Sequence, residues 1–278
     1  MQAKLQLKLQ TKTFKTGRWY LSYDQRFAGT QRIYGQTALN GFRHSHVCVI
    51  GIGGVGSWVA EGLARSGIGE ITLIDADDIC ITNTNRQVHA LDSTVGEMKA
   101  EAMAARILQI NPECLVHCEA QFINSENVQE LLGLHLDYVV DAIDNVADKA
   151  AVIASCKRSK ISVITIGGAG GQIDPGSVTS ADLSKTTNDP LAAKVRSKLR
   201  RDHGFSRSGK RFAVECIYSR EQLKYPQQDG SIGTDKSFIA QGGLDCDTGF
   251  GSATVVTSTF AMLATAKVLN KLMLKAEQ

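Results

Sequence analysis

The sequence predicts an α/β protein: a Rossmann-like, mostly parallel β-sheet with helices on both faces, plus a C-terminal extension. Short apolar runs alternate with helical patterns of about 10–15 residues between 47 and 166, which is typical of a parallel sheet. The first apolar run leads directly into a glycine-rich segment, 51–57, and then into a helical pattern. The second apolar run ends in Asp75. A nucleotide-binding β-α-β unit requires this order.

The expected elements follow in chain order. Residues 23–46 mix arginines, small residues and scattered apolar side chains, which favours one or two short helices. Short apolar runs predict strands over 47–50, 71–74, 115–118, 138–142 and 161–166. Helical patterns lie between them, over 57–67, 97–110, 125–134 and 146–159. Gly67 and Gly69 end the first of these helices, and Asn111-Pro112 follows the second.

The alternation ends after Pro175. Beyond it, helices are predicted over 190–202 and over the apolar-leaning segment 253–274. Polar residues interrupt the last helix, so we predict that it is buried and amphipathic and that the protein does not insert into a membrane. We expect a flexible N-terminal tail, 1–20, and a single domain, 21–278, with a basic insertion around 181–235.

The composition is that of an ordinary globular protein, with 43% hydrophobic and 21% charged residues in a chain of 278. The seven cysteines are odd in number and form no CxxC pair, which favours reduced thiols and a cytoplasmic location. The N-terminal segment has scattered lysines and no apolar signal core.

Glycines dominate the segment that follows the first strand. Gly51, Gly53 and Gly56 permit a tight turn, let phosphate approach the backbone, and place a helix N-terminus against an anion. Packing glycines in a turn are the alternative, but the flanking strand and helix favour phosphate binding. Asp75 stands where an acid can bond ribose hydroxyls; a strand-end or capping acid is the alternative. To this point a nicotinamide-dependent oxidoreductase explains the pattern equally well.

Basic residues separate these functions, because a site that cleaves a triphosphate needs cations and a nicotinamide site does not. Arg86 and Lys99 follow Asp75 on the predicted loop and helix, where they can meet phosphates. Asp144 ends a later strand, where a carboxylate can hold Mg²⁺ through few protein contacts. The alternatives are solvated surface charges for Arg86 and Lys99, and a helix N-cap for Asp144.

The combined motifs GxGGxGS (51–57), DxDxxxxxNxxRQ (75–87), GxxK (96–99) and DAIDN (141–145) resemble the ubiquitin-activating-like adenylyltransferase superfamily. Its bacterial members include activators of the molybdopterin and thiamine sulfur carriers. The resemblance implies ATP and Mg²⁺ as cofactors, ribose binding by Asp75, phosphate contacts by Asn83, Arg86 and Lys99, and Mg²⁺ at Asp144. The predicted nucleotide site comprises Gly51, Gly53, Gly54, Gly56, Ser57, Asp75, Asp77, Asn83, Arg86, Gln87, Lys99, Asp144 and Asn145.

In that superfamily an arginine from a dimer partner often completes the site. Arg26 and Arg32 are the candidates here, so the resemblance also implies a homodimer. The predicted catalytic set is therefore Arg86, Lys99, Asp144, Arg26 and Arg32.

One departure and five further motifs narrow the resemblance. Sulfur-carrier activators usually hold zinc with two CxxC pairs, which this chain lacks. The chain instead resembles the tRNA threonylcarbamoyladenosine dehydratases, at 32–35 (RIYG), 167–175 (GGAGGQIDP), 189–194 (DPLAAK), 225–227 (YPQ) and 249–254 (GFGSAT). This branch implies ATP-dependent cyclisation of the threonylcarbamoyl group on an adenosine beside the tRNA anticodon. Activation of a ubiquitin-like sulfur carrier is the alternative function, and a non-enzymatic scaffold is a further, less favoured one.

The implied chemistry needs no protein nucleophile. Adenylation of the threonyl carboxylate gives a good leaving group, and an atom of the substrate's own carbamoyl group can close the ring at a high effective concentration. Cys216 and Cys246 are considered as thioester formers because superfamily relatives use thioesters, but small buried thiols are the favoured interpretation. A bacterial sulfur-transfer system is associated with this branch, so a protein of that system is a candidate partner.

A basic segment suggests the macromolecular partner. Residues 194–211 have a local charge of +7, which leaves −4 for the rest of the chain. Five residues of the predicted helix are candidates for tRNA phosphate contact: Lys194, Arg196, Lys198, Arg200 and Arg201. A solvated helix face is the alternative. We expect Phe205 and Phe212 to pack in the core rather than stack on bases. Residues 244–252, rich in glycine and acids, are considered as a loop for a monovalent cation.

Overall fold

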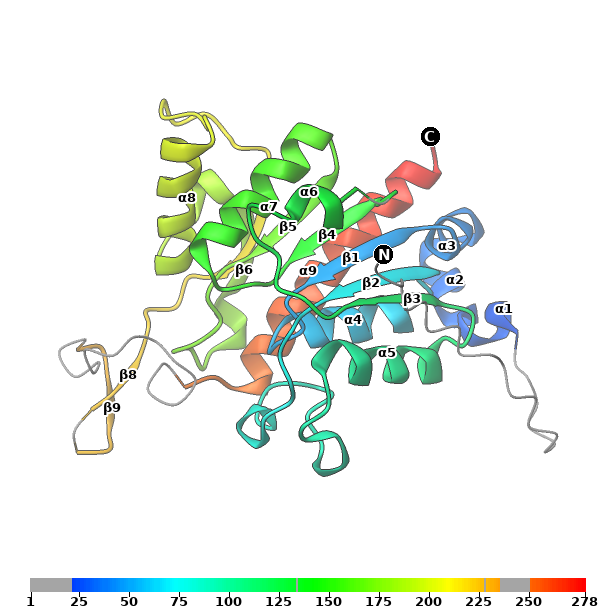
Figure 1. The fold of residues 1–278 in the computed structure, drawn as a ribbon, viewed down its shortest axis with the longest axis horizontal. Helices are drawn as coiled ribbons and strands as arrows, with labels where there is room; N and C mark the ends of the chain where they lie inside the picture. The colour runs from blue at the N-terminus through cyan, green and yellow to red at the C-terminus, as the bar shows by residue number, and fades with distance from the viewer. Residues whose placement is uncertain (1–21, 134, 228, 236–250) are drawn as a thin grey trace, which may run out of the picture.

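The computed structural model describes residues 22–133, 135–227, 229–235 and 251–278 (Figure 1). Its centre is a seven-stranded sheet with the strand order β3-β2-β1-β4-β5-β7-β6. The strands are β1 (His46–Ile50), β2 (Glu70–Ile74), β3 (Leu115–Glu119), β4 (Tyr138–Asp141), β5 (Ser162–Ile166), β6 (Val178–Asp182) and β7 (Glu215–Ser219). All neighbours pair in parallel except β6, which pairs antiparallel with β7 at one edge. The fold class predicted from the sequence is confirmed.

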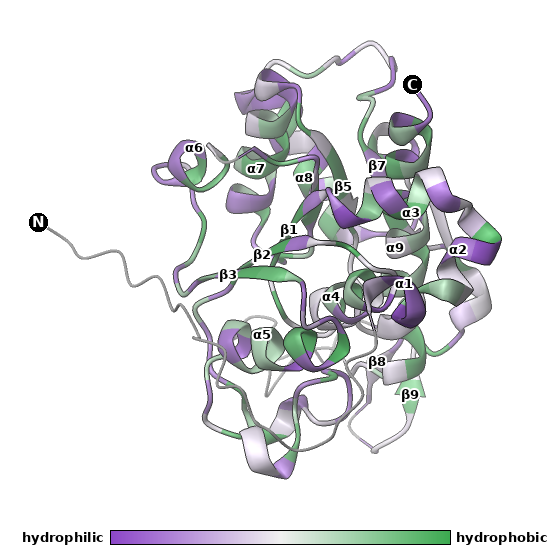
Figure 2. Cartoon of the chain, turned by 90° about the vertical axis from the view of Figure 1, so that its right-hand side faces the viewer, coloured by the Kyte–Doolittle hydropathy of each residue, from purple (hydrophilic) through white to green (hydrophobic). Residues whose placement is uncertain are grey.

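Helices cover both faces of the sheet, as Figure 2 shows for α6 and α7 on one side and α4 and α5 on the other. The helices are α1 (Tyr23–Arg26), α2 (Ala28–Tyr34), α3 (Gln36–Arg43), α4 (Gly56–Arg65), α5 (Lys99–Ile110), α6 (Val128–Leu131), α7 (Val146–Ser159), α8 (Pro190–Asp202) and α9 (Thr254–Ala276). Side chains alternate across each strand, so Val47 and Val49 pack against α3, α4, α5 and α9, whereas Cys48 and Ile50 pack against α6, α7 and α8. Burial on both faces explains the nearly continuous apolar runs of the central strands.

The predicted elements between 46 and 166 agree with the structure within a few residues, except that α6 is a single turn within the predicted 125–134 helix. β6 and β7 were not predicted. β6 reads VTSAD and is half-buried along its length, so it has no apolar run. β7 nevertheless pairs with β5, so the segment expected as a basic insertion supplies a strand to the main sheet. A two-stranded hairpin, β8 (Tyr225–Pro226) with β9 (Ile232–Gly233), follows it.

The last helix, α9, contacts α3 and α4 through buried residues that include Val256, Phe260 and Leu269. No helix in the described ranges is long and apolar enough to span a bilayer. The tail predicted over 1–20 lies outside the described residues.

Candidate nucleotide site

The glycine loop joins β1 to α4 at the carboxyl ends of the strands. Gly51 has a φ of +82°, a left-handed conformation that favours glycine, and its N–H donates to the Ile74 carbonyl at 2.9 Å. A Cβ atom at Gly56 would lie 1.7 Å from the Gly51 carbonyl oxygen, so no side chain fits there. At Gly53 the nearest atom to such a Cβ is 4.0 Å away, on Gln87. No side chain caps α4, and its Ser57 N–H donates to the Gly53 carbonyl at 3.1 Å. The N-terminus of the helix thus lies at the glycine loop, where an anion site would require it.

These two glycines give a matched test of the loop. We expect Gly56→Ala to destabilise the protein by about 1–3 kcal/mol or more, because the new Cβ overlaps the Gly51 carbonyl. Gly53→Ala has room for its Cβ and should unfold at the wild-type temperature, but it should bind ATP more weakly because the methyl group enters the space over the loop. Thermal unfolding and calorimetric ATP titration measure the two effects. Equal ATP affinity in Gly53→Ala and wild type would mean that phosphate does not lie over this glycine.

Asp75 is buried at the end of β2 and holds the glycine loop. Its Oδ2 accepts a hydrogen bond from the Ile52 N–H at 2.6 Å, and its Oδ1 accepts one from the Asp77 N–H at 2.9 Å. Burial raises the pKa of Asp75, and the two amides and Lys99 oppose this effect. Asp75 therefore has the structural role considered in the sequence analysis, and its carboxylate retains further acceptor capacity for the predicted ribose contact.

Lys99 is the first residue of α5, and its side chain is only 9% exposed. The Nζ atom lies 2.6 Å from Oδ2 of Asp77, whose side chain is 50% exposed. The interpretation of Lys99 as a solvated surface charge is therefore wrong. A buried ammonium that shares one exposed carboxylate is suited to exchange that partner for a phosphate group, because both supply anionic oxygens.

The loop after β2 lies over the glycine loop. Nη1 of Arg86 donates to the Thr82 carbonyl at 2.9 Å and to Oδ1 of Asn85 at 3.0 Å. A Cβ at Gly54 would touch the Arg86 side-chain carbons at 3.4 Å, and Trp58 of α4 donates to the Arg86 carbonyl at 3.0 Å. The structure thus brings Arg86 to the glycine loop through backbone and side-chain contacts.

Three other predicted residues on these segments are buried. The Oδ1 of Asn83 accepts the Cys80 N–H at 3.1 Å, which closes a turn, and the Ser57 hydroxyl oxygen accepts the Val88 N–H at 3.4 Å. Gln87 lies beside Gly53, and its Oε1 is buried without a hydrogen-bond partner among the described residues. Buried amide oxygens are normally satisfied, so this atom marks a place for a donor from a ligand or water.

Asp144 and Asn145 follow β4, next to the glycine loop: a Cβ at Gly51 would lie 3.0 Å from Ala142 and Ile143. Asn145 is the N-cap of α7, because its Oδ1 accepts the N–H groups of Ala147 and Asp148. The helix N-cap considered for Asp144 is therefore wrong. Asp144 is exposed, and no hydrogen bond or ion pair joins its carboxylate to another residue in the described ranges. That free carboxylate fits the oxygen donor that Mg²⁺ prefers.

A buried ion pair missed by sequence reasoning supports this turn. Nζ of Lys149 donates to Oδ1 of Asp141 at 3.0 Å and to the Ile143 carbonyl at 2.8 Å, and the Thr165 hydroxyl donates to Oδ2 of Asp141 at 2.7 Å. Asp141 and Lys149 are both fully buried. The network fixes the backbone that presents Asp144. Its only signal in the sequence is an acid that ends an apolar strand, eight residues before a lysine on the next helix.

Arg26 and Arg32 lie far from the glycine loop within this chain. Both are exposed, on α1 and α2, and Nη1 of Arg26 donates to the Ile110 carbonyl at 3.4 Å (Figure 1). Ile110 ends α5, whereas Lys99 begins it, so at 1.5 Å per residue about 16 Å separates them. Arg26 is therefore held at the end of α5 opposite to Lys99, and the supply of Arg26 and Arg32 by a second protomer stays a prediction.

The basic residues of α8 do not form one free face. Arg196 is half-buried, contacts the Thr186 hydroxyl, and lines a cavity of about 340 Å³ together with Asp189 and Tyr225. Lys198 and Arg201 both pair with Asp202, and Arg200 lies over the Phe212 ring. Lys194 is exposed.

The burial of two phenylalanines and one cysteine bears on two further interpretations of the sequence. Phe205 and Phe212 pack edge to face, with centroids 5.0 Å apart, against the core, as predicted. Cys216 is buried, and burial raises its thiol pKa far above the ordinary value, so it has the environment of an inert thiol. Cys246 and most of the 244–252 loop lie outside the described residues.

The glycine loop, Asp75, the buried Lys99 and the free carboxylate of Asp144 form one candidate nucleotide site. The model of the ThiF family matches residues 23–276 of this chain. The chain belongs to the ThiF family. It is 53% identical to a tRNA threonylcarbamoyladenosine dehydratase from Escherichia coli, over 92% of this chain and 96% of that protein. The identity to the Haemophilus influenzae protein of the same name is 52%, over 91% of this chain and 95% of the relative.

Solved structures agree with the sequence comparison. The E. coli dehydratase, in a crystal structure described as a complex with ATP, is 50% identical, with a TM-score of 0.82 over 91% of this chain and 96% of the other. The E. coli molybdopterin-synthase adenylyltransferase is 32% identical over only 47% of this chain and 51% of its own length. The similarity to the dehydratases thus covers nearly the whole chain, whereas similarity to this sulfur-carrier branch covers half.

Proposed function

We propose that this ThiF-family protein is a tRNA threonylcarbamoyladenosine dehydratase that uses ATP to activate the threonyl carboxylate of the modified adenosine. The observation that carries the proposal is the identity above 50% to enzymes of that name over nearly the full length of both chains. The site geometry supports it, because Lys99, Arg86 and Asp144 lie around the glycine loop, where a triphosphate would need them.

The first step activates a poor electrophile. A carboxylate resists attack at carbon because its leaving group would be oxide. A threonyl carboxylate oxygen therefore attacks the α-phosphorus of ATP. The bond between that phosphorus and the oxygen that bridges it to the β-phosphate breaks, and pyrophosphate leaves. The product is an acyl-adenylate. Positive groups and amides that meet the phosphate oxygens lower the barrier, since charge moves onto pyrophosphate as the bond breaks.

The second step closes the ring. An atom of the carbamoyl group attacks the activated acyl carbon, loses its proton and expels AMP, so the substrate has lost the elements of water. Because the nucleophile belongs to the same molecule as the acyl group, its effective concentration is high. No cysteine is needed, which fits the inert environment of Cys216.

The residues at the loop have separate roles in this scheme. The amides that begin α4 bind phosphate oxygens, and Lys99 exchanges its contact with Asp77 for a contact with phosphate. Arg86 contributes a second cation, and Asp75 bonds the ribose from the end of β2. Asp144 would hold Mg²⁺, which when bound neutralises phosphate charge. Arg26 and Arg32 complete the site from the partner in a homodimer.

The cellular setting is part of the proposal. We infer a cytoplasmic enzyme with reduced thiols, whose macromolecular substrate is tRNA. A sulfur-transfer protein as partner and a monovalent cation at 244–252 remain predictions from the sequence resemblance.

The test compares three substrates in ATP–pyrophosphate exchange. We expect exchange with tRNA that carries threonylcarbamoyladenosine, and none with unmodified tRNA or with a ubiquitin-like sulfur-carrier protein. Mass spectrometry of the modified nucleoside should show the loss of one water. Exchange driven by the carrier protein instead would replace the proposal with the alternative function.

The α8 surface gives a separate prediction for tRNA. Lys194→Ala combined with Arg201→Ala should raise the KM for tRNA roughly three- to tenfold. The salt dependence of this KM should decrease, because a protein with fewer phosphate contacts releases fewer counterions when it binds tRNA. The KM for ATP should not change. Lys271→Ala, a lysine on the exposed side of α9, is the matched control. If the double variant binds tRNA as tightly as the wild type at every salt concentration, this face of α8 does not belong to the tRNA interface.

A further inference from the structure

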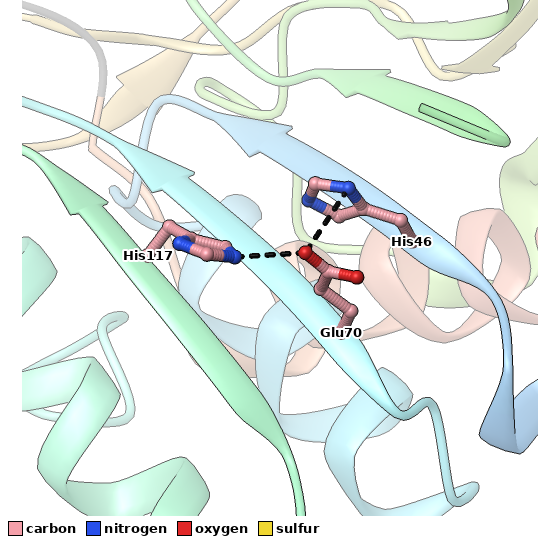
Figure 3. Close-up of side chains that lie close together, drawn as sticks. All are labelled: His46, Glu70 and His117. Carbon is pink, nitrogen blue, oxygen red and sulfur yellow. Dashed lines mark hydrogen bonds and ion pairs between the residues drawn. The ribbon is translucent and has the colours of Figure 1, made fainter. Parts of the chain in front are cut away.

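Three potential metal ligands meet at the amino-terminal end of the sheet, far along the strands from the glycine loop. His46, Glu70 and His117 come from β1, β2 and β3, and their side chains point toward one another (Figure 3). In the parallel register His46 pairs with Glu70, and Thr72, two residues on, pairs with His117, so all three ligands occupy one face of the sheet. The proposed function uses none of them.

The distances suit a small tetrahedral ion. Oε1 of Glu70 lies 2.8 Å from Nε2 of His117 and 3.5 Å from Nδ1 of His46. The three ligand atoms all lie within 4.8 Å of one another. Tetrahedral zinc with bonds of about 2.0–2.1 Å places its ligand atoms about 3.3–3.4 Å apart. The two separations that involve Glu70 lie on either side of this value, and the two histidine nitrogens lie within 4.8 Å of each other, so the side chains would shift to place all three ligands at coordination distance.

The surroundings hold the His46 ring in place. Its Nδ1 lies 3.1 Å from the His135 carbonyl oxygen, which can only accept, so Nδ1–H donates to that oxygen and Nε2 accepts from the Thr72 hydroxyl at 2.7 Å. Metal binding at Nδ1 would require its proton to move to Nε2, which can then donate to the Thr72 hydroxyl oxygen. Such an outer hydrogen bond is what fixes the tautomer of a metal-binding histidine.

Access and charge also fit. The side chains of Glu70 and His117 are 34% and 39% exposed, which leaves room for an ion to enter and for a water ligand. Oδ2 of Asp137 accepts the His46 backbone N–H at 2.8 Å, and its Oδ1 pairs with Lys275 at 2.6 Å, so the negative charge of the cluster itself comes from Glu70. Two neutral imidazoles and a carboxylate form a donor set typical of zinc, whereas Mg²⁺ prefers oxygen ligands throughout.

We propose that His46, Glu70 and His117 bind a divalent transition-metal ion, with Zn²⁺ the best match, separately from the nucleotide site. A five-residue strand at about 3.3 Å per residue places the cluster on the order of 16 Å from the carboxyl ends where the glycine loop lies. The ion would tie three strands together at this edge. The proposal does not rest on the proposed function.

The test is calorimetric titration of the metal-stripped full chain with ZnCl₂, without ATP or Mg²⁺. We expect one Zn²⁺ per chain with a Kd of roughly micromolar or lower, and a higher unfolding temperature in the presence of excess zinc. His117→Ala and Glu70→Gln should each weaken binding at least about tenfold. Both replace partly exposed side chains on different strands, and circular dichroism checks that each variant folds.

The controls separate this site from adventitious binding. Cys118→Ser removes an exposed thiol from β3, and His44→Ala removes an exposed histidine near β1; both should bind zinc as the wild type does. Co²⁺ in place of zinc should give the visible absorption of a tetrahedral complex in the wild type and lose it in His117→Ala. The proposal fails if the wild type takes up no zinc, or if His117→Ala and Glu70→Gln retain wild-type affinity. It also fails if Cys118→Ser abolishes binding. Failure would leave His117 in its contact with Glu70, and the ATP chemistry would be unaffected.

Discussion

Replacing Lys99 with methionine should lower the rate of ATP–pyrophosphate exchange by at least about 100-fold, the cost typical of losing one preorganised charge from a transition state. The ammonium is buried at the start of α5 and its counter-ion, Asp77, is half-exposed. Because methionine has a similar length and no charge, the variant removes the contact to phosphate and preserves the packing. The measurement is initial exchange rate with saturating modified tRNA, and with ATP varied so that kcat and KM separate.

The fold should tolerate this change. Without Lys99 the Asp77 carboxylate turns to water, so no buried charge is left without a partner, and the unfolding temperature should move by only a few degrees. Lys157→Met, an exposed lysine near the end of α7, is the matched control and should exchange at the wild-type rate. Exchange in Lys99→Met above a tenth of the wild-type rate, with normal ATP affinity, would remove Lys99 from the proposed mechanism.

Local patterns in the sequence predicted most of the arrangement of the candidate nucleotide site, whose ligand contacts stay a prediction. Strand, glycine turn and helix are consecutive in the chain, so the spacing of Gly51, Gly53 and Gly56 carries their geometry directly. Asp75 likewise follows from its place at the end of an apolar run. The sequence pattern does not distinguish residues that contact a ligand from residues that support the fold. Asp75 also accepts the Ile52 N–H, and Asn145 rather than Asp144 caps α7.

The features that were missed depend on contacts between distant segments. β6 has no apolar run because it is an edge strand, half-buried along its length, and only its pairing with β7 identifies it as part of the sheet. The pair Asp141–Lys149 depends on how α7 packs on β4. Glu70 and His117 are 47 residues apart, and they meet only because β2 and β3 pair in one particular register. A shift of one residue would turn one of them to the opposite face.

Two inactive variants should restore each other if Arg26 and Arg32 act across a dimer. The double variant Arg26→Ala, Arg32→Ala and the variant Lys99→Met are each expected to be inactive in exchange. In a mixed dimer, the site built on the arginine-deficient chain has an intact Lys99 and receives arginines from its partner. Random pairing of a symmetric homodimer gives one such site in about four, so co-expression of the two should recover about a quarter of the wild-type activity.

The position of Arg26 within one chain separates it from Lys99. Arg26 is bonded to the end of α5 that is opposite to Lys99, so within one chain it cannot meet phosphates that Lys99 binds. Co-expression of Lys99→Met with Asp144→Ala is the control, because both residues belong to the same chain's site and no mixed dimer has an intact one. Recovery in this control would show that Lys99 and Asp144 serve different sites. If the arginine and lysine variants stay inactive together while size-exclusion chromatography and mass spectrometry show that mixed dimers form, the arginines are not supplied by the partner.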